Sequence, residues 1–220
     1  MLGGLLTLSA VALGDALTSR SLASGRNVLF LLIAGTSCVV MTGLPEVFFP
    51  ALPERLLMVL KAGLGPLAGA MGLYYLSNWL GGVREDSLVH RFTVMGGAVL
   101  LLAALALAAV ATRVTPARFP DLLALAAAVN MVPVLLAMLA VRRAHQLGDP
   151  LARWMAVGIV CLAATTAGLY ARGLNVSGLG LGTWLATATA TVAYFLIASV
   201  LALLRNQHNR RLARLSRLDQ

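Results

Sequence analysis

The chain has 220 residues, of which 60% are hydrophobic and 11% charged, and its mean hydropathy is +0.88. Soluble globular domains carry a smaller apolar share, so this composition predicts an integral membrane protein. The formal net charge of +9 would favour nucleic acid as the partner of a soluble protein. Here the Arg residues lie between apolar runs, so we expect membrane lipid as the partner and no nucleic acid.

Seven apolar segments predict an all-α fold, a polytopic bundle of seven transmembrane helices. In chain order they cover residues 2–18, 28–42, 54–80, 92–112, 120–141, 151–171 and 183–204. The runs are continuous rather than alternating, which favours helices over membrane strands. Most of them approach the roughly 20 residues that cross a hydrocarbon core. The connections are short, so consecutive helices are expected to be antiparallel neighbours.

Basic residues lie mainly on one side of this predicted bundle. The connections after the first, third and fifth helices and the tail carry Arg20, Arg26, Arg84, Arg91, Arg142, Arg143, Arg153, Arg205, Arg210, Arg211, Arg214 and Arg217. The other side carries Arg55, Arg113, Arg118 and Arg172. Because cytoplasmic loops are enriched in Lys and Arg, we expect an outer N-terminus and an inner C-terminus. Termini on opposite sides require an odd number of spans, which seven satisfies.

Polar residues inside the apolar runs are the candidate ligand contacts, because a polar group in hydrocarbon is costly without a partner. Lys61 lies near the outer start of its helix. It is interpreted either as an anion-binding cation or as a side chain that extends to the headgroups. Asn130 lies near the middle of its helix, where it can contact a ligand or form an interhelical hydrogen bond worth about 1 kcal/mol.

A second group of polar residues closes the outer ends of the last two helices. It comprises Tyr170, Arg172, Trp184 and Thr187. Together with Lys61 and Glu46, these residues could line one outer cavity that binds a small carboxylate or another anion. The alternatives are an interfacial belt for Arg172 and Trp184, and hydroxyl bonds from Thr187 to its own backbone. At the inner end of the third helix, four residues are also interpreted as belt residues, namely Tyr74, Tyr75, Asn78 and Trp79.

The remaining motifs indicate structure rather than chemistry. Gly65 and Gly69, with Pro66 between them, form a GxxxG pattern that allows close helix approach. Cys38 and Cys161 lie in separate apolar runs and are expected to behave as small apolar residues. No Walker, GxSxG or HExxH pattern occurs, and the His residues show no metal spacing. We therefore expect no catalytic residue, metal site or cofactor within this segment.

The last apolar run continues into a basic tail with no Gly or Pro between Thr183 and Gln220. This predicts one rod that joins a transmembrane domain (1–204) to a cytoplasmic linker helix (205–220). Leucines at three-and-four spacing in the tail form a weak coiled-coil pattern, which favours a homodimer through the last membrane helix and residues 205–219. The alternative is a basic helix that lies on anionic lipid.

Three stretches resemble a known family. They are the hairpin at 43–52, the sequence LYARGL at 169–174, and the last membrane helix that runs into a charged helix. They resemble the membrane region of bacterial seven-transmembrane receptors with diverse intracellular signalling modules. The resemblance implies a multi-pass protein of the bacterial cytoplasmic membrane that passes a signal to a cytoplasmic effector.

The end of the tail resembles the start of a GGDEF diguanylate cyclase domain. Asp219 and Gln220 match the first two positions of its Asp-x-Leu-Thr-Gly-Leu turn. The resemblance implies a parent protein that makes cyclic di-GMP, with Mg²⁺ and GTP bound only in the cyclase domain. None of the cyclase's catalytic residues falls within these 220 residues.

The sequence thus predicts a membrane sensory region that regulates a dimeric cytoplasmic effector through its last helix. Two alternatives remain. The first is a small self-contained transporter or channel, which requires a continuous polar path across the bundle. The second is a passive membrane anchor for a histidine kinase or another effector.

Overall fold

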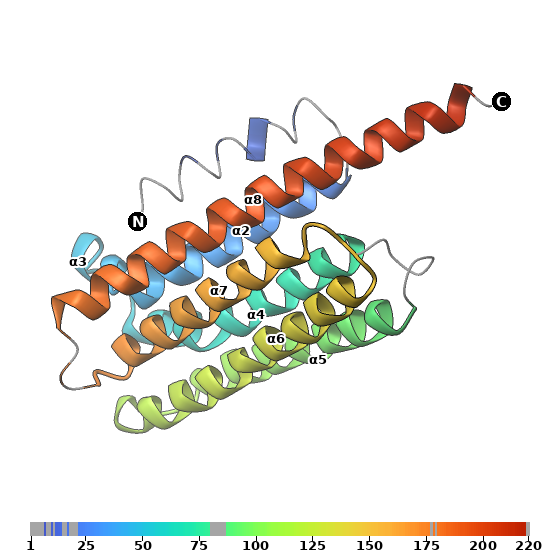
Figure 1. The fold of residues 1–220 in the computed structure, drawn as a ribbon. Helices are drawn as coiled ribbons and strands as arrows, with labels where there is room; N and C mark the ends of the chain where they lie inside the picture. Colours follow the sequence, from blue (N-terminus) through green and yellow to red (C-terminus); the bar gives the residue numbers. More distant parts are fainter. Residues whose placement is uncertain are drawn as a thin grey trace.

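The computed structural model describes residues 7, 10, 12–14, 17, 22–79, 87–176, 178 and 180–218. Its regular elements within these residues are all helical, which confirms the all-α class (Figure 1). They are α2 (Leu22–Met41), α3 (Leu44–Phe48), α4 (Glu54–Trp79), α5 (Ser87–Ala111), η2 (Pro116–Arg118), α6 (Phe119–Gln146), α7 (Ala152–Gly173) and α8 (Leu181–Leu218).

The chain is a multi-pass helical membrane protein. Five of the described helical segments are long and apolar enough to cross a bilayer: Glu54–Leu76, Ser87–Ala111, Pro116–Gln146, Ala152–Gly173 and Leu181–Leu201. The apolar part of α2, Val28–Met41, is shorter, because Arg26 and Asn27 interrupt the run before it. Apart from single positions, the predicted helix at 2–18 lies outside the described residues.

Consecutive helices pack side by side and alternate in direction, as the short connections predicted. α4 lies against α2, α5 and α6, while α7 lies between α6 and α8 (Figure 1). At the end that carries α3, Arg55 Nη1 donates to the Thr112 carbonyl at 2.8 Å, and Arg172 Nε donates to the Thr42 carbonyl at 3.2 Å. We call this the α3 end of the bundle and the opposite one the tail end.

Helix ends differ from the predicted apolar limits where polar residues remain helical. α5 begins at Ser87 rather than at 92, and α6 continues to Gln146 rather than to 141. α6 stops because Gly148 adopts the left-handed region with φ of 79°. The Gly148 and Asp149 amides then donate to the carbonyls of His145 and Ala144, which is a Schellman ending.

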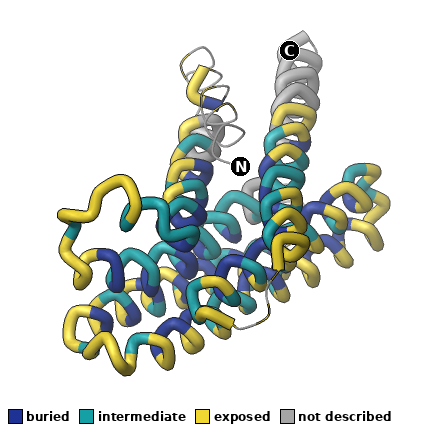
Figure 2. The backbone as a smooth tube through the Cα atoms, turned by 90° about the vertical axis from the view of Figure 1, so that its left-hand side faces the viewer, coloured by how far each residue is buried: buried dark blue, intermediate teal, exposed yellow. Residues whose placement is uncertain are grey.

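Burial follows the arrangement expected in a bilayer. Buried positions gather along the middle of the bundle, and exposed positions lie at its periphery (Figure 2). Phe195, Leu31 and Leu123 are among the most buried side chains, whereas Met95 and Leu102 on α5 are 67% exposed. Large apolar side chains on the outer face of a membrane bundle have lipid as their natural surroundings, since lipid tails are as apolar as they are.

Candidate ligand cavity

A cavity of about 150 Å³ lies inside the bundle. Five helices line it: α2, α4, α6, α7 and α8. Among the described residues that line it there is no Asp, Glu, Lys, Arg or His. An uncharged cavity of this kind excludes ions, because a bare charge is far more costly to bury than a neutral polar group.

Aromatic rings from α2, α4 and α8 form one wall of the cavity. The Phe30 ring stacks on the Tyr75 ring at 6.0 Å between centroids and 5° between planes. It also meets Phe195 at 6.4 Å and the edge of Tyr194 at 6.5 Å. Tyr75, which was expected in an interfacial belt, also belongs to the cavity lining. Phe30 of α2 thus contacts both Tyr75 of α4 and the rings of α8.

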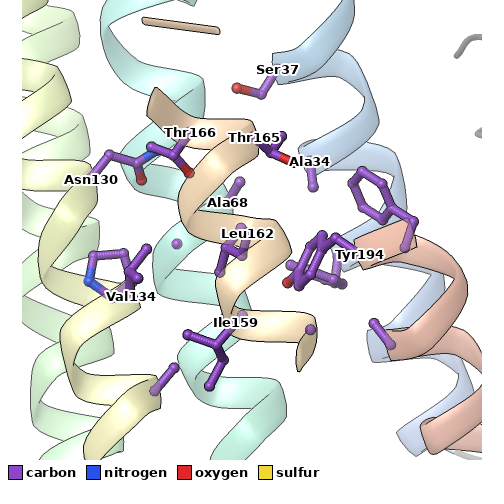
Figure 3. Close-up of a pocket in the computed structure, with 18 of the residues that line it drawn as sticks. Ala34, Ser37, Ala68, Asn130, Val134, Ile159, Leu162, Thr165, Thr166 and Tyr194 are labelled. Atoms are coloured by element: carbon purple, nitrogen blue, oxygen red, sulfur yellow. The ribbon is translucent and has the colours of Figure 1, made fainter. Parts of the chain in front are cut away.

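Polar side chains gather at the other part of the cavity. Figure 3 shows Ser37, Asn130, Thr165 and Thr166 together in its upper half, with Val134 and Ile159 below them. Thr165 Oγ1 donates to the Cys161 carbonyl at 2.8 Å. Asn130 makes no side-chain hydrogen bond within the part of the chain that the structure describes. Its amide therefore has both a donor and an acceptor free for a ligand.

The predicted GxxxG pair brings three helices together beside this polar group. A Cβ on Gly65 would overlap the Tyr170 hydroxyl and lie 3.2 Å from Asn130 Nδ2. A Cβ on Gly69 would lie 2.6 Å from Pro133 Cγ. The bare backbone of α4 thus allows α6 to approach closely, as predicted, and leaves room for the Tyr170 side chain of α7. Tyr170 is only 5% exposed, and its hydroxyl has no hydrogen-bond partner among the described residues.

Lys61 does not line the cavity. It forms an ion pair with Glu46 of α3, and Glu46 Oε2 is buried. Burial acts to raise the pKa of the Glu46 carboxyl, but the hydrogen bond and charge of Lys61 outweigh it, with help from a backbone amide. The net result is a pKa below the usual value. The pair ties α3 to α4 at the α3 end.

The remaining predicted residues also lie outside the cavity lining. The Arg172 guanidinium carbon lies 4.2 Å from the centre of the Trp184 ring, a cation–π contact. Thr187 Oγ1 donates to the Thr183 carbonyl at 2.8 Å, which matches the backbone bond foreseen for it. A Cβ on Gly168 would overlap this hydroxyl, so α7 and α8 are in close contact here. Of the six candidate residues, the cavity brings together Asn130 and Tyr170.

Sequence reasoning missed the aromatic wall and the small polar residues Ser37, Thr165 and Thr166. Phe30 lies near the start of an apolar run and Tyr194 and Phe195 lie in the middle of another, where an aromatic side chain is indistinguishable from ordinary core. A useful signal was available in α7, where Thr165 and Thr166 place two hydroxyls in mid-helix. Adjacent mid-membrane hydroxyls, like a mid-membrane Asn, are candidates for interhelical or ligand hydrogen bonds.

The described residues hold no group of three or more His, Cys, Asp or Glu side chains that could bind a metal ion. Cys38 is buried in the cavity wall, as expected of a small apolar residue. No family model, curated protein or solved structure matches the chain.

Proposed function

We propose that the chain is the transmembrane sensory region of a bacterial signalling protein. In this account a small molecule enters the central cavity and alters the position of α8. The altered helix then changes the pairing of cytoplasmic tails, which sets the activity of an effector. The function rests on one feature, namely that α8 belongs both to the cavity wall and to the tail.

The observation that carries the proposal is the continuity of α8. It runs unbroken for 38 residues from Leu181 to Leu218, about 57 Å at the usual helical rise. The hydrocarbon core takes only about 30 Å of that length. In the membrane part, Tyr194 and Phe195 form part of the cavity wall, and beyond it the helix extends past the bundle (Figure 1). A displacement at the wall therefore reaches the tail with no flexible joint between them.

The packing of α8 supports such a displacement. Along one side it rests on α7, where Gly168 faces Thr187 and Gly158 faces Ile197. On the cavity side it meets α2 through the Phe30 ring, which contacts Tyr194 and Phe195. A helix held closely on one side and by a few rings on the other can shift against its neighbours, a common element of switching proteins.

The distribution of polar groups favours sensing over transport. A transport path needs polar groups or water from one membrane face to the other. Ser37, Asn130, Thr165 and Thr166 lie in the upper half of the cavity in Figure 3, above the apolar side chains of Val134 and Ile159. The aromatic wall adds the phenol groups of Tyr75 and Tyr194, and these residues form no row of charged side chains across the bundle. This arrangement suits a molecule that binds and leaves by the same route.

The orientation and the effector complete the proposal. The Arg-rich connections and tail support placing the tail end in the cytoplasm, and the leucine spacing supports tails paired through residues 205–219. The effector we propose is a diguanylate cyclase, on the resemblance of residues 212–220 to the start of a GGDEF domain. Mg²⁺ and GTP would then belong to that domain.

Cysteine cross-linking in membrane vesicles tests this function. Single cysteines placed in turn at positions 205–212 should form disulfides between two copies with a period of three to four residues. Filling the cavity with Ala68→Leu should then change which positions cross-link. A passive anchor would give the same pattern with and without Ala68→Leu.

A further inference from the structure

The size of the central cavity limits its occupant to a molecule of about one ring. Its volume is about 150 Å³. An engineered apolar cavity of this volume in another protein holds benzene. Drug-sized ligands occupy pockets at least twice as large, so the cavity fits a small compound with few rotatable bonds.

The lining determines the chemical character of that molecule. Since the described lining residues include no acidic or basic side chain, a charged ligand would lose its hydration without gaining a counter-ion from them. The walls include Phe30, Tyr75, Tyr194 and Phe195, and aromatic rings pack well against other rings in offset or edge-on arrangements. Met41 and Met155 add sulfur atoms, which also favour aromatic neighbours. The occupant is neutral and largely aromatic.

The polar half of the cavity calls for one hydrogen-bonding group on this molecule. The Asn130 amide and the Thr166 side chain point toward each other at the cavity wall (Figure 3). The Asn130 side chain has no hydrogen-bond partner among the described residues, and neither has the buried hydroxyl of Tyr170 beside it. Buried polar groups are nearly always paired, so a partner from outside the chain is expected for the Tyr170 hydroxyl. The half-buried Asn130 amide lies beside that hydroxyl and can contact the same partner.

We infer that the central cavity binds a small neutral aromatic molecule with one hydroxyl group, of the phenol class, whose ring lies among the rings of α2, α4 and α8 and whose hydroxyl pairs with Asn130. The inference names the ligand class of the cavity on which the proposed function rests. It departs from the anionic ligand expected from the sequence, because Lys61 and Arg172 lie outside the lining and have their own partners.

The test is a titration of the full chain in lipid nanodiscs with phenol, followed by ¹³C-methyl NMR of the methionines. Met41 and Met155 line the cavity, while Met95 on α5 is 67% exposed and serves as the control for phenol dissolved in lipid. Saturable shifts are expected at Met41 and Met155 alone. The Ala68→Leu variant, which fills the cavity, should lose them.

Two further probes test the hydroxyl and the charge. Wild-type protein should bind phenol roughly 3- to 10-fold more tightly than benzene, the ratio expected for one hydrogen bond. In Asn130→Leu this preference should vanish while benzene still binds, which keeps the test valid if Ala68→Leu does not fold. Benzoate should bind more weakly than both.

Linear shifts at every methionine, shifts that persist in a folded Ala68→Leu variant, or tighter binding of benzoate would each overturn the inference. So would a site filled only by water, which gives no saturable shift with phenol. These outcomes concern binding alone. The proposed function is tested separately by the response of α8, so phenol binding without any response of α8 would reject the function and leave the ligand class standing.

Discussion

Asn130 and Tyr170 show the free-energy cost of a polar side chain without a partner in a membrane helix. Leaving such a group unpaired costs about 1–3 kcal/mol when it is buried. Both side chains lie beside Gly65, where α4, α6 and α7 meet, and neither has a side-chain hydrogen bond within the described residues. A ligand that supplies the missing partner gains more there than the same hydroxyl would gain in water.

Gly168 is expected to be irreplaceable at the contact between α7 and α8. Gly168→Ala places a Cβ on the Thr187 hydroxyl, so the helices must separate, at a cost of about 1–3 kcal/mol. Gly35→Ala on α2 is the matched control, because nothing lies within 4 Å of its Cβ, and it should be neutral or stabilise by up to about 1 kcal/mol. Thermal unfolding in detergent measures both, and equal midpoints would contradict this contact.

The Glu46–Lys61 pair is expected to make stability depend on pH in the acid range. The folded protein holds the pKa of Glu46 below its usual value of about 4.3. The pair thus stabilises the protein above that value, and its contribution is lost as the pH falls through the lower folded pKa.

The unfolding midpoint, followed from about pH 6 to about pH 3, measures this contribution. The difference in unfolding midpoint between the wild type and the Glu46→Gln variant should disappear toward the acid end of this range. The corresponding difference in free energy should be small at neutral pH, within about 1 kcal/mol, because the Glu46 side chain is 36% exposed. An advantage over Glu46→Gln that stays constant across the range would show that the ion pair is not its source.

At the scale of elements, α8 can carry a displacement from the cavity to the tail only if it remains one continuous helix. Leu203 lies just beyond the candidate span and is 39% exposed. Leu203→Pro should therefore interrupt the helix, at a cost of about 3 kcal/mol to the rod, without disturbing the core. Leu203→Ala keeps the rod and is the control.

Spin labels measure this effect. Introduced at positions 147 and 209 as a non-canonical amino acid, they leave Cys38 and Cys161 in place, and Leu147 is 59% exposed at the tail end. The distribution of label-to-label distances should become broader in the Leu203→Pro variant. It should also no longer change when phenol is added. A response equal to that of Leu203→Ala would mean that α8 does not carry the signal as a rod.

The α3 hairpin is expected to rest in the membrane interface. Val47, Phe48 and Phe49 are consecutive and 73%, 68% and 65% exposed, and aromatic side chains favour the headgroup region. A spin label at Val47 should be relaxed by oxygen, which concentrates in lipid. When both Phe48 and Phe49 are replaced by Ser, the label should be relaxed less by oxygen and more by a water-soluble nickel complex. An unchanged ratio of the two effects would place the hairpin outside the interface.

At the scale of the whole molecule, the sequence predicted the helices better than the cavity. Continuous apolar runs determine where helices form, because any spanning segment must satisfy its own backbone. The GxxxG pair also placed a close contact correctly. Periodicity says nothing about which faces meet, however, so Phe30 and Phe195 could not be joined from sequence alone.

The charged residues show why the predicted site differed from the observed cavity. An isolated cation in an apolar run indicates a ligand only when no partner is at hand. Lys61 pairs with Glu46, which lies 15 residues away in sequence, and Arg172 stacks on the Trp184 ring. Such partners depend on how the α3 hairpin and the start of α8 fold back, which no local pattern determines. Asn130 lies too deep to reach the surface, and the structure places it in the cavity lining.

The most direct test of the account is the distance between spin labels at positions 147 and 209 in the full chain in nanodiscs, measured by double electron–electron resonance with and without phenol. A shift of about 2 Å is expected at saturating phenol, because helix displacements in switching proteins are of this size and a rigid helix carries them to its end. Ala68→Leu should show no shift. Identical distances with and without phenol, while Met41 and Met155 report that phenol is bound, would contradict the coupling of the cavity to α8.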